Sequence, residues 1–368
     1  MLLHTFADAQ AIPPKRMWQA LRTMRHHPPG RAARGNRRDT FNGAIEQAEQ
    51  LFAAAEATDP AARPILLFYG LSQLGRAIAA VSTTLDNTEY RLYRHGLDHE
   101  SLDGAAQHGL ANLHVWGRAS GAFPVVAKAL GADALQQRRR LGDIWALVPD
   151  ANRFPLPGSG ELRSLPLYSE MPPAPMEDWA RGLLMELPLR LLLDDDEEPV
   201  TGYGPELSRL MEVSQSDPAR IARQRHRLRG WLAQYPSLAG WDFVTAPDGP
   251  VGYRLHDGGR SLDLPLRVPK FAESTELVAL QQRAFTYHSI MAVYPQLSDG
   301  QPAHPFMLWW AVLYVLSRLA RYEPRDWMRL VDVSQSAEAA AIEYLLDEAM
   351  LALPEVAYSC IEAVATGS

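Results

Sequence analysis

The sequence predicts a mainly α-helical protein with a mixed α/β insertion. Apolar residues recur every three to four positions between residues 39 and 81 and again after residue 305, which is the period of packed helices. Between these blocks, short apolar runs alternate with breaks rich in glycine and proline, as in short strands and loops. Because both helical blocks are apolar around most of their circumference, we expect the N- and C-terminal helices to pack together as one helical domain.

These patterns set the expected boundaries. Residues 1–38 form a basic irregular arm, residues 39–104 and 301–368 form the helical domain, and residues 105–300 form the mixed α/β insertion. Seven arginines lie in the arm, and prolines and glycines interrupt it, so we expect no long helix there. A solvated arm is favoured over an arm that contacts phosphates.

Composition indicates a globular protein of the cytoplasm. The 368 residues are 47% hydrophobic and 21% charged, and the net charge of −7 argues against a protein that coats nucleic acid. The single cysteine, Cys360, excludes an intramolecular disulfide framework and a zinc site built on several thiolates. The first residues do not have the pattern of a secretory signal, and the longest apolar stretch, 306–316, has about half the length that crosses a bilayer.

Two helices open the N-terminal block. The first begins at Asp39 or Thr40, either of which can cap it, and ends before Pro60. The second spans residues 65–81, and the two form an antiparallel pair. A polar connection follows over residues 82–104. It contains three apolar anchors: Tyr90, Leu92 and Tyr93.

The centre contains three features that predict local structure. Pro188 lies in an apolar run and predicts either an edge strand or two separate pieces. Five consecutive acidic residues, 194–198, are interpreted as a solvated loop rather than a cation site, because adjacent carboxylates lack the spacing of ligands. Residues 218–233 predict a helix with an apolar stripe and five surrounding arginines.

Three helices are predicted near the C-terminus. The first covers residues 306–320, and Pro324 opens the second. Ser336 caps the third, which Pro354 is expected to break. We interpret His304 as a core or cap residue and Cys360 as a buried, inert thiol.

Three segments resemble the YaaC-like protein family of bacteria. That family shows an aliphatic helix with Tyr-Tyr-Gly-Leu, then His-Gly-Leu, then Leu-Ser and Arg-Tyr-x-Pro-x-x-Trp. The corresponding residues here are Phe68, Tyr69, Gly70 and Leu71, then His95, Gly96 and Leu97, then Leu316, Ser317, Arg321, Tyr322, Pro324 and Trp327. Only Phe68 departs, since tyrosine is common there. The resemblance implies a bacterial cytoplasmic protein with a mainly helical frame and no assigned activity.

The densest group of residues suited to proton transfer or ligand binding lies between residues 91 and 108. His95 and His99 have the spacing of two metal ligands on a helix, and Glu100 could add a carboxylate. Gly96 disfavours a helix there, so the preferred interpretation is that His95 fixes a loop by hydrogen-bonding backbone carbonyls. No metal is expected.

Arg94 and His99 also match an Arg-x4-His pattern that resembles HEPN-type metal-independent ribonucleases. The resemblance implies that His99 activates a ribose 2′-hydroxyl and that Arg94 stabilises phosphate charge. The same spacing recurs at Arg22 and His27, so the pattern is weakly specific.

No glycine-rich phosphate loop or nucleophile elbow is present in the sequence. We therefore favour a non-catalytic binding or regulatory protein, with the ribonuclease as the alternative and no cofactor. The expected binding residues are Arg91, His95, Glu100 and Arg321. An RNA or protein partner would dock on the local basic patches, and a homodimer stays open.

Overall fold

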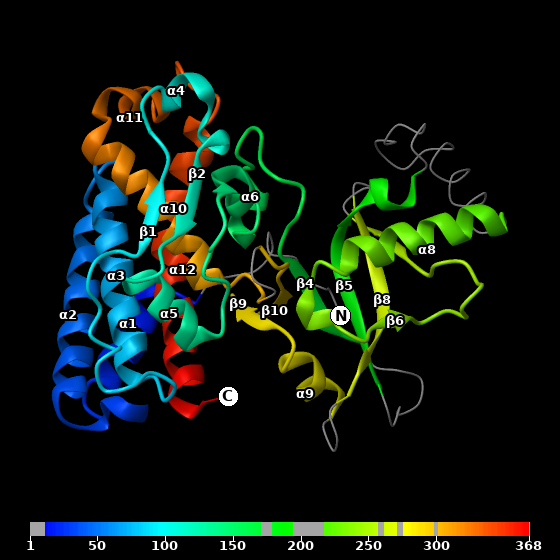
Figure 1. Cartoon of the computed structure of the whole chain (residues 1–368), viewed down its shortest axis with the longest axis horizontal. Helices are drawn as coiled ribbons and strands as arrows, with labels where there is room; N and C mark the ends of the chain where they lie inside the picture. The colour runs from blue at the N-terminus through cyan, green and yellow to red at the C-terminus, as the bar shows by residue number, and fades with distance from the viewer. Residues whose placement is uncertain are drawn as a thin grey trace. The chain divides into compact units, whose positions relative to one another are not determined.

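The computed structural model describes residues 12–170, 179–193, 217–256, 261–270, 275–297 and 301–367 (Figure 1). The acidic run 194–198, expected to be a solvated loop, lies outside these residues. Contacts divide the chain into two units. The helical unit comprises Ala9–Arg163 and Gln296–Ser368, and the sheet unit contains Ser164–Pro295.

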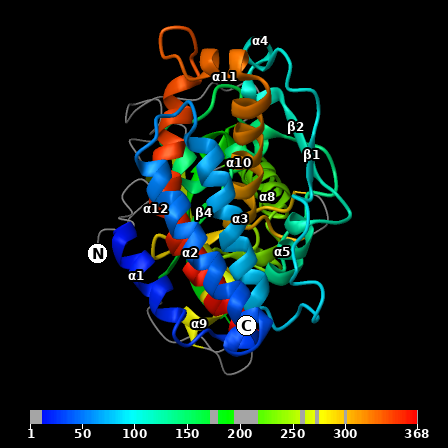
Figure 2. The ribbon, with the colours of Figure 1, turned by 90° about the vertical axis from the view of Figure 1, so that its left-hand side faces the viewer.

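Long helices form most of the helical unit (Figure 2). Its longer helices are α1 (Pro14–Met24), α2 (Asn36–Glu56), α3 (Arg63–Val81), α5 (Ala122–Leu130), α10 (Pro305–Tyr322) and α12 (Ala339–Thr366). Its short helices are α4 (Ala105–His108), α6 (Leu141–Trp145) and α11 (Pro324–Leu330), with 3₁₀ turns at Gly30–Ala33, Leu110–Asn112 and Pro149–Asn152. A small antiparallel sheet joins β1 (Leu97–His99), β2 (His114–Gly117) and β3 (Arg139–Arg140).

Helix α3 is the centre of this unit. It contacts α2, α5, α10 and α12, and α12 also contacts α1, so helices from the two ends of the chain meet. Leu67, Leu71, Leu74 and Ile78 of α3 are fully buried. Their recurrence every three to four residues explains why the segment is helical and why it needs neighbours on several sides.

The expectation of an irregular arm over residues 1–38 is wrong between Pro14 and Met24, because these residues form helix α1. Met17, Trp18 and Leu21 form a buried stripe on α1 that packs against α12 and α2, while the arginines stay outside. The expected caps of the next helix are also wrong. Helix α2 begins at Asn36, after Gly35 and without a side-chain cap.

The boundary between the parts also differs from the expectation. Residues 105–163 belong to the helical unit instead of the insertion, because α5 packs on α3 and both α6 and β1 pack on α10.

Two further corrections concern single residues. Tyr93 is exposed, unlike the buried anchors Tyr90 and Leu92, and α12 continues through Pro354, which is buried in the core.

The sheet unit holds a seven-stranded antiparallel sheet in the order β6-β8-β5-β4-β10-β9, with β7 also paired to β8. Its strands are β4 (Leu165–Ser169), β5 (Trp179–Pro188), β6 (Asp242–Phe243), β7 (Arg254–His256), β8 (Ser261–Pro269), β9 (Phe285–Tyr287) and β10 (Ile290–Val293). Helices α8 (Pro218–Leu232) and α9 (Glu276–Gln281) complete it with 3₁₀ turns at Leu189–Leu192 and Pro236–Leu238. Pro188 ends β5, so the apolar run forms two pieces, and β5 lies inside the sheet and not at its edge.

Mixed α/β structure is therefore confirmed. Two described helices, α3 and α12, are long and apolar enough to cross a membrane by length and composition alone. In their most apolar windows, 67% and 56% of the residues are buried within the protein. Core helices of soluble proteins pass the same test, so these two helices are weak evidence for a membrane span.

Candidate functional site

The predicted site residues 91–100 lie on the segment that leaves the C-terminal end of α3 and returns alongside it to β1 (Figures 1 and 2). A guanidinium nitrogen of Arg76 on α3 donates to the Leu92 carbonyl at 3.0 Å. The carbonyls of Arg94 and His95 accept hydrogen bonds from the first amides of α5. The segment is thus fixed by backbone contacts on both sides.

Gly96 allows the chain to turn here without a steric clash with α5. Its φ is +80°, and a Cβ there would lie 2.6 Å from the Cδ of Pro124. The turn places Leu97–His99 in strand β1, so His95 and His99 do not share a helix face. The two histidines therefore do not have the placement of two metal ligands on one helix, because the left-handed glycine lies between them. No group of three or more metal-binding side chains occurs in the described ranges.

Both ring nitrogens of His99 are engaged. Its Nδ1 lies 2.6 Å from the Glu100 carbonyl, which can only accept, and its Nε2 lies 3.1 Å from the Nε of Arg318, which can only donate. This pattern requires the neutral Nδ1–H tautomer. His99 therefore has no nitrogen left to take a proton while these bonds persist.

His95 differs from His99, because its ring nitrogens make no hydrogen bond to any residue that the structure describes. Its ring centroid lies 5.3 Å from that of Phe68 and 6.3 Å from those of Tyr69 and Tyr314. Burial, followed by the positive charges of Arg321 and Arg318, lowers the pKa of His95. The expectation that His95 fixes a loop by hydrogen-bonding backbone carbonyls is wrong. The histidine whose ring contacts a backbone carbonyl is His99.

Arg321 joins α10 to α3. It donates from Nη1 to the Tyr69 hydroxyl at 2.8 Å and from Nε to the Ser317 carbonyl at 3.0 Å. The second bond is a contact with a carbonyl near the C-terminal end of its own helix. We call Tyr69, His95, His99, Tyr314, Arg318 and Arg321 the His95 cluster. The three segments that carry the family resemblance meet in it.

Sequence reasoning missed two members, Tyr314 and Arg318, and Arg318 is the one that donates a hydrogen bond to His99. It lies three residues before Arg321, and this helical spacing puts both guanidiniums on neighbouring positions of one face. Its Cζ also lies 4.0 Å from the ring centroid of Tyr322. The spacing from Arg321 was the signal that could have identified Arg318. Nothing in the sequence indicates that α10 lies against β1, so the contact with His99 could not be predicted.

The remaining predicted residues have other roles. Glu100 accepts from the backbone amide of His114 at 2.8 Å, and its Oε1 lies 3.1 Å from the ring Nδ1 of His114. Arg94 is exposed, and its side chain makes no hydrogen bond or ion pair with the described residues. The cation hydrogen-bonded to His99 is Arg318, and the pairing of Arg94 with His99 stays a prediction.

A second feature of the helical unit is a pocket of about 740 Å³, which we call the basic pocket. It lies where the start of α2 meets residues 87–91. The lining residues are Gly30, Arg31, Ala33, Arg34, Asn36, Arg37, Asn87, Tyr90 and Arg91. Four of these nine described residues are arginines and none is acidic. Of the predicted site residues, Arg91 belongs to this pocket.

Arg37 holds the wall of the pocket. It is 6% exposed, and its guanidinium donates to backbone carbonyls at the end of α3 and beyond it. The acceptors are Ala79 at 3.3 Å, Ala80 at 3.1 Å, Ser82 at 3.3 Å, Leu85 at 2.9 Å, and Asp86. Burial and then the charge of Arg31 lower the pKa of Arg37. Its hydrogen-bonding capacity is therefore used within the protein.

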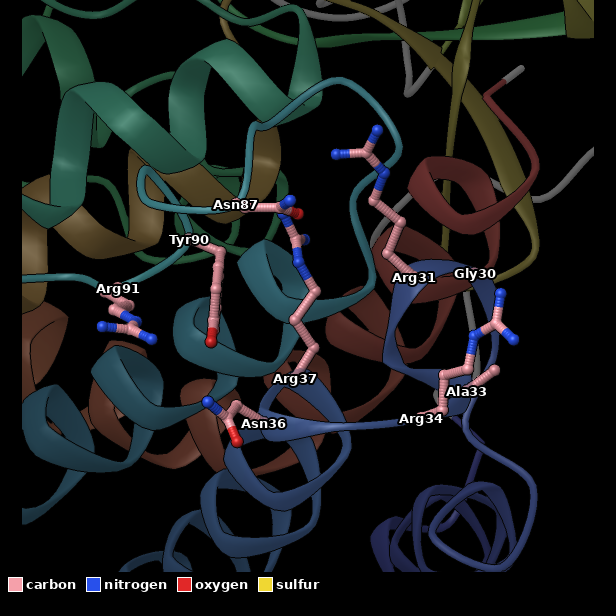
Figure 3. Close-up of a pocket in the computed structure, with 9 residues that line it drawn as sticks. All are labelled: Gly30, Arg31, Ala33, Arg34, Asn36, Arg37, Asn87, Tyr90 and Arg91. Atoms are coloured by element: carbon pink, nitrogen blue, oxygen red, sulfur yellow. The ribbon is translucent and has the colours of Figure 1, made fainter.

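The other three arginines are exposed. Figure 3 shows Tyr90 and Arg37 in the middle, with Arg91 on one side and Arg31 and Arg34 on the other. Arg31 donates to the Leu85 carbonyl at 2.6 Å, while Arg34 makes no side-chain hydrogen bond within the described ranges. Because no side chain caps α2, its first amides add partial positive charge to the same place.

Comparison with known proteins gives one match. A family model described as YaaC-like Protein matches residues 9–361, which is nearly the whole chain. No curated protein and no solved structure matches this chain.

Proposed function

Because the chain belongs to the YaaC-like protein family, whose membership alone supplies no activity, we propose from the geometry that it is a binding protein for phosphate-bearing ligands. The basic pocket is the proposed binding site. This develops the binding or regulatory role that the sequence favours. The observation that carries the proposal is the gathering of three exposed guanidiniums around one cavity without an acidic side chain among its lining residues.

The chemistry of the lining suits phosphate. Each guanidinium presents paired N–H donors that match two phosphate oxygens, and the uncapped start of α2 favours a negative charge. The volume, about 740 Å³, falls in the range typical of small-molecule sites. Since Arg37 already holds the carbonyls at the end of α3, Arg31, Arg34 and Arg91 are the groups that would bind the ligand.

Titration calorimetry with pyrophosphate and with a mononucleotide tests this proposal. We expect the double variant Arg34→Ala/Arg91→Ala to weaken binding by at least tenfold, and added salt to weaken binding to the native protein. The matched control is Arg325→Ala, which removes an exposed arginine of α11 outside the pocket. Equal affinity of the double variant and the native protein would contradict the proposal.

We also propose a cytoplasmic location. Cys360 is a free, buried thiol, and burial raises its pKa, which suits a chain that needs no oxidising compartment. Fractionation of cells that produce the tagged protein tests this, and recovery with the membranes would contradict it.

A metal-independent ribonuclease is the second candidate function, and one observation favours it. His95 is a proton acceptor without a hydrogen-bond partner among the described residues, and both Arg318 and Arg321 lie close enough to lower its pKa. In this reaction His95 takes the proton of a ribose 2′-hydroxyl, and the 2′-oxygen attacks the adjacent phosphorus. The P–O5′ bond breaks, and the 5′-oxygen takes a proton from protonated His95, leaving a 2′,3′-cyclic phosphate.

Two variants separate the possible catalytic pairs. If His95 is the base, His95→Ala abolishes cleavage of a labelled RNA, whereas Arg94→Ala leaves the cleavage rate at saturating RNA unchanged. If the Arg94 and His99 pair is correct, Arg94→Ala abolishes cleavage. Melting temperatures check that each variant is folded, and absence of cleavage by the native protein would rule out the ribonuclease.

A further inference from the structure

We propose that the ligand of the basic pocket is part of a longer molecule, a single-stranded polynucleotide that extends from the pocket along residues 87–99 to the His95 cluster. This inference rests on the proposed binding of phosphate in the basic pocket. It adds the class of ligand and a second contact region, which the pocket alone does not specify.

The two regions lie at different levels of one helix. Arg37, which lines the pocket, binds the carbonyls of Ala79 and Ala80, whereas Tyr69 of the same helix accepts from Arg321 in the His95 cluster. Ten residues of helix separate Tyr69 from Ala79, which corresponds to about 15 Å. Residues 87–99 follow α3 over this distance (Figures 1 and 2). A ligand that reaches both regions must therefore be extended.

Exposed cations and aromatic rings alternate along this path. Arg91 is followed by Tyr93, which is 71% exposed, and then by the exposed Arg94. At the far end, Tyr322 is 56% exposed and lies against both Arg318 and Arg321. The path thus repeats positive charge and exposed tyrosine side chains from one end to the other.

Acidic residues on the same segment are paired. Glu89 lies 2.5 Å from the Nζ of Lys128, and Asp98 lies 2.7 Å from a guanidinium nitrogen of Arg118. These pairs offset the negative charge beside the path. The net charge of −7 for the whole chain therefore does not describe this surface.

This combination favours an unpaired strand over a duplex. Arginines contact the phosphates whatever the sequence, and tyrosine rings stack on bases only where those bases are unpaired. A duplex offers phosphates but no free base faces, so it would use only part of the surface. RNA and DNA strands share the required chemistry.

Fluorescence anisotropy with labelled 12-nucleotide strands tests the inference. We expect the native protein to bind single-stranded RNA or DNA at least tenfold more tightly than pyrophosphate and than the matching duplex. Tyr93→Ala should weaken oligonucleotide binding about tenfold and leave pyrophosphate binding unchanged, and Tyr93→Phe should restore it because the ring remains. Tyr358→Ala on α12 is the matched control.

The outcomes separate this inference from the proposed function. If pyrophosphate binds at the pocket but the strand binds no more tightly, or if Tyr93→Ala has no effect, the polynucleotide inference is overturned and the pocket proposal stands. Equal binding of strand, duplex and heparin also overturns it, since charge alone would explain them. Binding to anionic vesicles without binding to strands would do the same. If pyrophosphate does not bind, the proposed function itself fails, and the polynucleotide inference that rests on it fails with it.

Discussion

Three histidines of this chain differ because of the groups that surround their ring nitrogens. His99 uses both nitrogens, toward a carbonyl and a guanidinium, and therefore positions neighbouring groups. His95 uses neither nitrogen with the described residues. His304 is buried, accepts from the amide of Phe306 through Nδ1, and faces the Sγ of Cys360 through Nε2 at 3.9 Å. The partners of each ring therefore set what each histidine does in the fold.

Protonation of His304 should destabilise the protein. Burial lowers its pKa to about 3, while the unfolded chain has a value near 6.5. As pH falls between these values, the unfolded state takes up a proton that the folded state does not. The free energy of unfolding should therefore fall by about 1.4 kcal/mol per pH unit from this residue, and the stability is fully present above pH 6.5.

Urea denaturation at pH 6.5, 5.5 and 4.5 measures this slope. His304→Asn is the informative variant, because asparagine can still cap α10 but does not titrate. We expect its slope to be smaller by about 1.4 kcal/mol per pH unit, whatever its absolute stability. His95 contributes equally to the pH dependence of the native protein and of the variant. Equal slopes for the two proteins would therefore show that His304 does not titrate in this range.

Close packing at the element scale depends on the glycines of α3. A Cβ at Gly75 would lie 2.3 Å from the Cζ3 of Trp310, and Trp310 is fully buried on α10. Because the ring is enclosed in the core, room for the Cβ requires a shift of the ring or of the two helices.

We expect Gly75→Ala to destabilise the protein by about 1–3 kcal/mol, although alanine is the better helix former. Gly43→Ala on α2 is the matched control, because a Cβ there meets nothing within 4 Å. It should stabilise by up to about 1 kcal/mol. Urea denaturation of both variants gives the comparison, and a stabilised Gly75→Ala would show that α3 and α10 are less tightly packed.

Element prediction worked where the apolar period was clear. Helices α3 and α10 were predicted to within two residues, and α11 begins at Pro324 as expected. Prediction failed at α12, where Pro354 removes one backbone donor but the helix continues. The buried face of α12 packs against α1 and α3, and that burial outweighs the local cost of the proline.

At the scale of the whole molecule, the described part of the sheet unit lies within one stretch of sequence and begins and ends on neighbouring strands. Leu165 of β4 stands opposite Val293 of β10 in an antiparallel pair, so their Cα atoms are about 5 Å apart. A short linker can therefore replace residues 164–295 without stretching the chain.

We expect the chain with residues 164–295 replaced by about four glycine and serine residues to keep a folded helical unit. All residues that line the basic pocket are retained, so pyrophosphate affinity should stay within about threefold of the full chain. Circular dichroism and thermal melting check folding, and titration calorimetry checks binding. A chain without a cooperative melt would show that the helical unit depends on the sheet unit.

The sequence by itself determined the mixed α/β class, the positions of α3 and α10 and the family resemblance, because the apolar period is encoded in neighbouring residues. It also pointed to His95, Arg91 and Arg321 by their chemistry. Only the tertiary structure decided which groups contact each other. Arg318 donates to His99, Arg321 donates to Tyr69, and Arg37 donates to carbonyls at the end of α3. Those contacts join residues up to 252 positions apart, and such distances depend on how helices pack, which no local pattern specifies.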